Sequence, residues 1–431
     1  MIFSKNTLTN ILIPVLLSII SGCIIFYKFP YIPQHISTDE VEFIQLAQSL
    51  ENIPYTPYSR LATGHATLYF YILLASIKLF GSTVFAVRFP SALFGVVDVV
   101  LIYFVFRLLF ESRKKFDSTL QIVFPFLFAF VFATVRWYFN FARFGFEAST
   151  VLFFELTGLL TFLLYRKYKN YGFLIGTGIL AGLAYNSYTP GRLFFLLPIM
   201  LLCFDFWNHK SAKKEIIKQL LYVLIPFVIC ITPLNLYFTQ HDDNRIYEQF
   251  FLQSERISIQ EKSSFLWENI TKVSGMFLFQ GDSNGRHNYP GKPMLNPFLG
   301  IFFIVGLLIS IFQWKKFPNK IFLLYFALGI LPPLLTYPWE NPNALRSVTV
   351  LPAVVFFIGQ SLQLITKISM YKKHVIYILF ILVGLSAIYE IRTYFVFQTL
   401  VFPSSFEISP DLLPQYLDGT YPIRPNSIQK L

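Results

Sequence analysis

The sequence predicts an all-α, polytopic membrane protein. Hydrophobic residues make up 55% of the 431 residues and charged residues only 13%, and the mean hydropathy is +0.56. A soluble domain needs a polar shell that this composition does not supply, so the apolar residues must face lipid. The net charge of +12 comes from short basic clusters between apolar runs. Membrane topology produces that pattern, and we therefore expect no nucleic-acid partner.

A helix needs roughly 20 apolar residues to cross the bilayer core, and this rule predicts about eleven spans. The predicted spans lie near 10–29, 83–110, 120–138, 149–165, 171–188, 192–207, 217–238, 298–313, 320–337, 348–366 and 375–391. Clusters of Lys and Arg follow alternate spans, whereas the acidic residues collect almost entirely on the other side. By the positive-inside rule the N-terminus is cytoplasmic.

This topology divides the chain into a transmembrane domain over 1–391 and a short extracytoplasmic tail over 392–431. Two outer loops stand out, at about 30–82 and about 239–297. In the first loop, 39–50 is predicted as an amphipathic helix, because its apolar residues recur at helical spacing. The apolar segment 67–80 is too short for a span and is predicted as a juxtamembrane helix.

The acidic pair Asp39 and Glu40 opens the amphipathic helix and supplies the candidate catalytic residues. Ser37 and Glu40 fit a capping box, in which each residue hydrogen-bonds the other's backbone. Capping explains Glu40 well and Asp39 poorly, since Asp39 heads the apolar stripe of Phe43 and Leu46. A carboxylate that loses hydration beside a membrane cavity is a candidate general base.

Cations accompany these acids on the outer side. Arg88 opens a span and Arg192 follows a Pro-Gly break, and guanidinium groups at the bilayer surface can hold a phosphate head group bidentately. Loop arginines are otherwise usually solvated or paired with acids such as Glu147 and Glu340, and the turn-rich segment 281–295 could be a simple connection. The candidate phosphate- or substrate-binding residues are Arg88, Arg143, Arg192, Asp282, Arg286, His287, Asn288 and Arg346.

A divalent metal is the one candidate cofactor. His65, Glu147 and His287 are its candidate ligands, although the separation of the histidines matches no zinc motif.

Five stretches in this order resemble the GT-C glycosyltransferases, in particular the bacterial proteins similar to protein O-mannosyltransferases and to the lipid A aminoarabinose transferase, a group like glycosyltransferase family 39. The stretches are the pair Asp39-Glu40, 65–71, 80–95, 281–295 and 343–347. The resemblance implies a GT-C-type helix bundle whose 1–391 region is catalytic. It also implies that Asp39 deprotonates or orients the acceptor, and that a divalent metal binds nearby in some relatives.

The implied reaction moves a sugar from a polyprenyl-phosphate donor to an acceptor, which is a protein, lipid or cell-envelope glycan, on the extracytoplasmic face of the plasma (inner) membrane. A phosphate leaving group needs positive charge and no general acid. The site is therefore expected to contain one carboxylate and several cationic side chains, and in-line attack should invert C1.

Two alternatives remain open on the sequence alone. An outer-leaflet oligosaccharide ligase or polymerase would use a longer, pyrophosphate-linked donor. A lipid-linked sugar transporter or flippase would place charges in mid-span and show an internal repeat. Asp98 and Glu155 are the clear mid-span acids, and the two halves of the sequence show no repeat.

Overall fold

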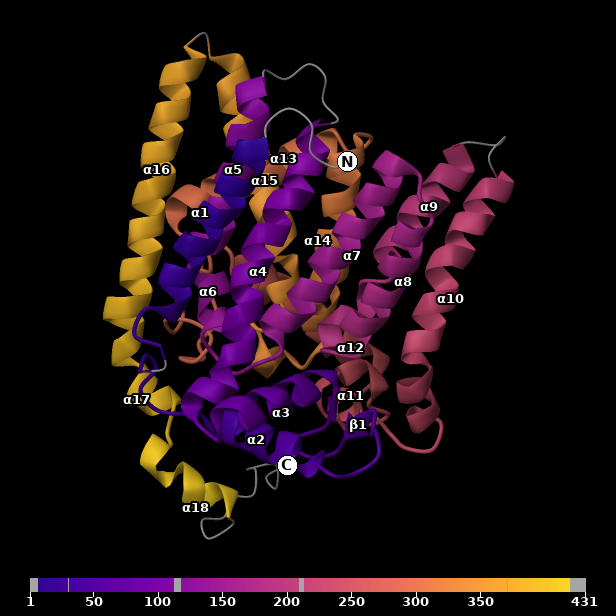
Figure 1. Cartoon of the computed structure of the whole chain (residues 1–431), viewed down its shortest axis with the longest axis vertical. Coiled ribbons are helices and arrows are strands. Elements are labelled where there is room, and N and C mark those ends of the chain that lie inside the picture. Colours follow the sequence, from indigo (N-terminus) through magenta and orange to yellow (C-terminus); the bar gives the residue numbers. More distant parts are fainter. Residues whose placement is uncertain (1–6, 30, 112–117, 209–212, 370, 419–431) are drawn as a thin grey trace.

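The computed structural model of the chain describes residues 7–29, 31–111, 118–208, 213–369 and 371–418. Long helices form a bundle, and shorter helices gather below one end of it (Figure 1). Among the described residues, seven helices are long and apolar enough to cross a membrane, and a pair bent by 62°, α5 and α6, brings the number to eight. The chain is therefore a multi-pass membrane protein, as predicted.

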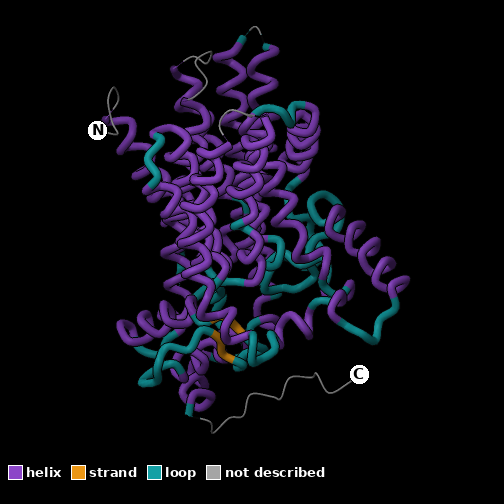
Figure 2. Tube along the Cα trace, turned by 90° about the vertical axis from the view of Figure 1, so that its right-hand side faces the viewer, coloured by secondary structure: helices purple, strands orange, loops and turns teal. Residues whose placement is uncertain are grey.

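The helices are α1 (Thr7–Phe26), α2 (Thr38–Ser49), α3 (Leu68–Phe80), α4 (Val84–Glu111), α5 (Ser118–Thr134), α6 (Arg136–Ala142), α7 (Ala148–Tyr168), α8 (Gly172–Tyr185), α9 (Leu196–Asn208), α10 (Lys213–Phe238), α11 (Asn244–Gln249), α12 (Ile259–Gly275), α13 (Pro297–Phe312), α14 (Phe317–Leu335), α15 (Leu351–Ile368), α16 (Lys372–Arg392), α17 (Phe402–Ser405) and α18 (Leu413–Leu417). The strands β1 (Tyr58–Ser59) and β2 (His65–Ala66) form one antiparallel pair, visible near the lower end of the bundle in Figure 2.

Each predicted span coincides with a helix, but the predicted count of about eleven spans, made on the rule of roughly 20 residues each, is not confirmed. The helices α8 and α13 and the apolar part of α1 have only 10–17 residues. The count of eleven therefore stays a prediction.

The first outer loop contains both helices predicted for it, since α2 and α3 lie below the bundle (Figure 1). The second predicted loop, over 239–297, also contains a helix, α12, which the sequence analysis did not predict. Ser258 and Glu261 form a capping box at its start. That S-x-x-E spacing was the sequence signal for this helix.

The C-terminal segment begins later than predicted. The last membrane helix continues beyond 391 through a π-helical turn and reaches Leu400. The chain then returns to α2, where Ile36 and Ile408 exchange two backbone hydrogen bonds of 2.9 and 3.0 Å. Gln45 of α2 donates to the Tyr416 carbonyl at 2.9 Å. Residues 402–418 thus form part of the structure around α2.

The helix α10, at the right-hand edge of the bundle in Figure 1, packs against α8 at two glycines of α8. A Cβ atom at Gly178 would lie 2.2 Å from the carbonyl oxygen of Val223, and one at Gly182 would lie 2.4 Å from Cβ of Cys230. Residues four apart share one helix face, so the two glycines let the backbones approach closely, as small residues do between membrane helices.

Replacing Gly178 by Val should push α10 away from α8. We expect a destabilisation of about 1–3 kcal/mol, the usual cost of overpacking, seen as a lower thermal midpoint in detergent. Gly384→Val in α16 is the control, because no atom lies within 4 Å of the corresponding Cβ position. Equal midpoints for the two variants would contradict the close approach.

Candidate active site

Glu40 is the buried carboxylate of α2. The predicted capping box is present, because the Ser37 hydroxyl accepts from the Glu40 N–H and Glu40 Oε2 accepts from the Ser37 N–H at 3.0 Å. Glu40 is fully buried and also accepts from Arg88 Nε at 2.8 Å and from the Gly145 N–H at 3.1 Å. Both oxygens of the Glu40 carboxylate therefore already accept hydrogen bonds from protein donors. Glu40, predicted as catalytic, therefore has a structural role.

Arg88 and Arg143, both predicted to bind phosphate, are also fully buried. Arg88 donates to the carbonyls of Pro33 and His35, each at 2.7 Å. Arg143 donates to four carbonyls in the segment 24–32. Apart from Arg143 Nε, these donors are directed at interior acceptors and not at the surface of the protein. The two arginines instead fix the connection between α1 and α2.

Asp39 and Arg286 meet on the open side of α2. An Asp39 carboxylate oxygen lies 2.6 Å from an Arg286 guanidinium nitrogen, although the residues are 247 positions apart. The Asp39 side chain is 39% exposed and that of Arg286 is 21% exposed. The predicted apolar stripe behind Asp39 is buried, including Phe43 and Leu46. Asp39 itself keeps part of its hydration, contrary to the prediction, because it lies at the first turn, where the helix face opens.

Glu42 of α2 interacts electrostatically with both members of this pair, although no sequence pattern assigned it a role. Burial first, and then the negative charge of Asp39, raise the pKa of Glu42, Arg286 opposes the rise, and the net pKa is about 7. The site therefore holds two carboxyl groups and one guanidinium, with one carboxyl about half protonated near neutral pH.

The segment 281–295 carries Arg286, and its other polar side chains make hydrogen bonds within the segment or to neighbouring parts of the chain. Asp282 Oδ2 accepts from the Ala344 N–H at 2.8 Å and lies 2.9 Å from His287 Nδ1. Asn288 donates to the Asp282 carbonyl at 2.9 Å. Asp282, His287 and Asn288 are all buried, so these three predicted binding residues shape the loop.

A second polar cluster lies behind the aromatic ring of Phe43, whose centroid is 5.1 Å from that of His65. His65 Nδ1 lies 2.6 Å from Glu147, and the Arg245 guanidinium lies 2.6 Å from His65 Nε2. Burial lowers the pKa of His65, Arg245 lowers it further, and Glu147 opposes the change. Two of the predicted substrate-binding arginines are also paired: Arg192 with Asp243 at 2.6 Å, and Arg346 with Glu340.

The residues predicted to hold a metal do not come together. His65 contacts Glu147, but His287 contacts Asp282 in the other loop. No group of three His, Cys, Asp or Glu side chains suited to a metal ion occurs within the described parts of the chain. The Arg245 guanidinium against His65 also opposes a cation there. The residues present do not fit the predicted metal, and we derive no step through one.

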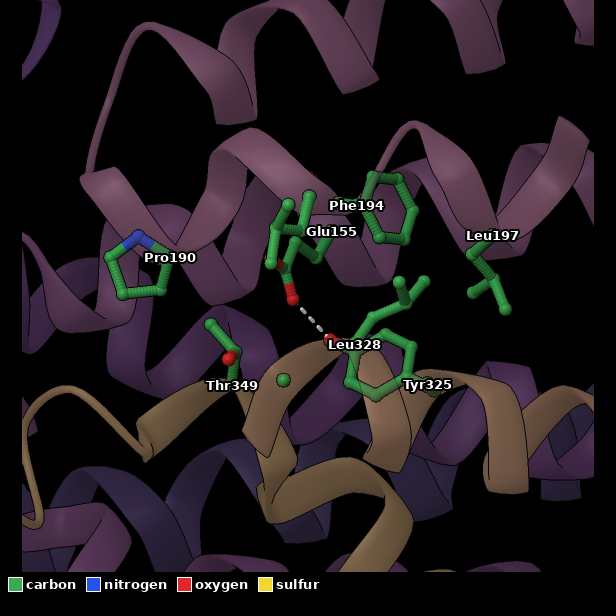
Figure 3. Close-up of a pocket in the computed structure, with 9 residues that line it drawn as sticks. Glu155, Pro190, Phe194, Leu197, Tyr325, Leu328 and Thr349 are labelled. Carbon is green, nitrogen blue, oxygen red and sulfur yellow. Dashed lines mark hydrogen bonds between the residues drawn. The ribbon is translucent and has the colours of Figure 1, made fainter. Parts of the chain in front are cut away.

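The mid-span acids make hydrogen bonds between helices. Glu155 of α7 accepts from the Tyr325 hydroxyl of α14 in a small pocket that Thr349 also lines (Figure 3). Asp98 of α4 lies 3.5 Å from the Tyr138 hydroxyl of α6, which also donates to the Gly95 carbonyl. Interhelical hydrogen bonding accounts for Glu155.

Residues 64–236 match the family described as dolichyl-phosphate-mannose-protein mannosyltransferase. ArnT from Cupriavidus metallidurans, solved bound to undecaprenyl phosphate, superposes with a TM-score of 0.54 at 12% identity, over 94% of this chain and 77% of ArnT. The chain has the GT-C fold.

The GT-C fold recurs in the oligosaccharyltransferase AglB from Archaeoglobus fulgidus, solved with an inhibitory peptide and a dolichol-phosphate. The TM-score is 0.53 at 15% identity, over 93% of this chain and 56% of AglB. The chain therefore spans about half the length of AglB. No curated protein sequence matches it significantly. The predicted resemblance to GT-C proteins is confirmed, and the family match includes Arg88 and Glu147 but neither Asp39 nor Arg286.

Removing the buried carboxylate should destabilise the GT-C bundle. Glu40→Ala leaves the Arg88 charge unpaired in the interior, which typically costs about 3–5 kcal/mol. Thermal unfolding in detergent measures the loss. Glu51→Ala is the matched control, because its pair with Lys78 is exposed and worth at most about 1 kcal/mol. A similar loss in both variants would contradict the anchoring role of Glu40.

The raised pKa of Glu42 predicts a pH dependence of stability. Between the ordinary value of 4.5 and about 7, the folded protein holds a proton that the unfolded chain has released. Stability from this group therefore falls as pH rises through that window and then levels off. Glu42→Gln should remove this decline, so that its thermal midpoint exceeds that of wild type at pH 8 and approaches it at pH 5. An unchanged slope, like that expected for Glu51→Gln, would refute the assignment.

Proposed function

We propose that this chain is an inverting glycosyltransferase that moves a sugar from a polyprenyl-phosphate-linked donor to an acceptor. The observation that carries the proposal is the contact of Asp39 with Arg286. It brings a candidate base and a candidate phosphate ligand together at a partly exposed position. The similarity to ArnT bound to undecaprenyl phosphate, and to AglB with a dolichol-phosphate, supports a lipid-linked donor. The mannosyltransferase family match supports a sugar as the transferred group.

The reaction follows from these two side chains. The acceptor hydroxyl oxygen attacks C1 of the sugar, the bond between C1 and the phosphate oxygen breaks, and the hydroxyl proton passes to Asp39. The electron pair leaves with the polyprenyl phosphate, whose growing charge Arg286 stabilises. Attack on the face opposite the leaving group inverts C1, through an oxocarbenium-like state.

Binding of the donor would also prepare the base. Arg286 and Asp39 neutralise each other in the structure, and a phosphate offers the guanidinium stronger, bidentate acceptors. Once Arg286 turns to the phosphate, Asp39 is released to the acceptor hydroxyl. Glu42 is partly protonated near neutral pH, so it adds less negative charge beside the donor than an ordinary glutamate would.

We place this site on the extracytoplasmic face of the plasma (inner) membrane, with a protein, lipid or cell-envelope glycan as acceptor. The charge asymmetry of the sequence supports this side, since the short clusters of Lys and Arg lie at the other ends of the predicted spans. Arg192 lines a small pocket together with His65 and Arg245, and Arg346 pairs with Glu340. Their side chains are 14% and 11% exposed, and both arginines stay candidate contacts for the rest of the substrate.

A second candidate function, transfer of an oligosaccharide from a pyrophosphate-linked carrier, has one observation in its favour. The fold matches the oligosaccharyltransferase AglB about as well as ArnT, with TM-scores of 0.53 and 0.54.

The test is a transfer assay on purified protein in detergent, with labelled polyprenyl-phosphate sugars, pyrophosphate-linked oligosaccharides and nucleotide sugars offered separately. We expect wild type to release polyprenyl phosphate, and Asp39→Asn to lower the rate by about 100-fold or more, as loss of a general base does. Asp242→Asn, which makes the same charge change at an exposed position of the second outer loop, should keep the wild-type rate.

Two outcomes would change the proposal. Turnover of Asp39→Asn within a few-fold of wild type would remove Asp39 from the mechanism. Turnover of the pyrophosphate-linked donor alone would establish the second candidate.

A further inference from the structure

We infer that Asn140 and Gln398 are positioning residues that aim Arg286 into the site. This inference rests on the proposed function, because it assigns the two residues a part in that reaction. Neither touches Asp39, and neither was a predicted site residue. They act through the backbone of the loop that carries Arg286.

The two amide side chains hold three consecutive carbonyls around Arg286. Asn140 Nδ2 donates to the Arg286 carbonyl at 2.8 Å and to the His287 carbonyl at 3.2 Å. Gln398 Nε2 donates to the Gly285 carbonyl at 3.3 Å and to Oδ1 of Asn140 at 3.0 Å. Asn140 is 2% exposed and Gln398 is fully buried. The two amides and the three carbonyls thus form one continuous, buried hydrogen-bond network.

The network joins three parts of the chain at one point. Asn140 comes from α6, the short helix below the 62° bend of a membrane span. Gln398 comes from the 3₁₀ turn at the end of the last membrane helix. The C-terminal segment adds a steric contact, since a Cβ atom at Gly285 would lie 2.1 Å from Oγ of Ser405. Rigid membrane helices on two sides therefore position an irregular loop.

Other bonds hold the loop on either side of this point, whereas the carbonyls of residues 285–287 are held by Asn140 and Gln398. The Arg286 N–H donates to Asn284 within the loop at 3.0 Å, and Arg136 of α6 donates to Asn288 further along. A side chain as long as Arg has many rotamers, and its reach depends on where its backbone is fixed. A misplacement of 1 Å in a reacting group can cost about 100-fold in rate.

The experiment compares Gln398→Met and Asn140→Leu, which keep side-chain volume and remove the amide, with Thr399→Val. Thr399 is the matched control because its hydroxyl donates to the Phe395 and Val396 carbonyls of its own helix. Each variant is assayed for release of polyprenyl phosphate from labelled donor, in the wild-type and Arg286→Ala backgrounds. Hydrogen–deuterium exchange of peptides from 281–295 is measured below every thermal midpoint.

We expect Gln398→Met and Asn140→Leu to lower kcat/KM for the donor by about 10-fold or more, and Thr399→Val to leave it unchanged. In the Arg286→Ala background each should cost less than about 2-fold, because residues that act through one side chain are not additive. Exchange should rise in 281–295 and stay unchanged in α12. A general loss of stability would instead lower the rate equally in both backgrounds.

The inference is overturned if the losses are additive with Arg286→Ala, or if exchange in 281–295 matches that of Thr399→Val. Either result would leave the proposed function standing. If wild type releases no polyprenyl phosphate from any donor, the proposed function falls and the catalytic part of the inference falls with it. The exchange data would still decide whether the network holds the loop.

Discussion

The buried pair of Glu40 and Arg88 determines the geometry of the outer end of the bundle. Moving two charges out of water costs several kcal/mol for each ion, and the structure offsets this cost only if every donor and acceptor is used. Arg88 satisfies Glu40 and two carbonyls of the preceding loop, and Gly145 adds a backbone donor. Successive helix residues are turned by about 100°. With Glu40 fixed in the interior, Asp39 is directed to the open side.

The two partners in the open site are fixed by different means. Asp39 is placed by the packing of α2, whose apolar stripe is buried below it. Arg286 lies in a loop without regular secondary structure. Hydrogen bonds from side chains hold its backbone in place, whereas helix α2 holds the backbone of Asp39. The structure thus combines a carboxylate on a rigid element with a cation on an irregular loop, and the loop is the part that mutation would loosen first.

Helix positions could be predicted because lipid requires long apolar runs, and the capping box could be predicted because it involves Ser37 and Glu40 alone. The burial of Glu40 could not, since its partner Arg88 lies 48 positions away and pairing across that distance leaves no local signal. The raised pKa of Glu42 could not be predicted either, because its main cause is burial, which depends on the tertiary structure. Arg88 and Arg143 were predicted to bind phosphate, because an arginine at the membrane surface suits a phosphate group. In the structure both guanidinium groups instead donate to carbonyl oxygens in the interior. The last span was predicted too short because a π-helical turn continues it to Leu400.

The bridge between Ile36 and Ile408 also sets an order of events during biosynthesis. Ile36 leaves the ribosome when almost none of the bundle exists, and Ile408 leaves it only after every membrane helix has been made. The segment around Asp39 must therefore wait, unpaired along this edge, while the remaining helices insert. The surroundings of Asp39 are completed only after the described membrane helices have been made, so a partly inserted chain holds Asp39 without its final neighbours.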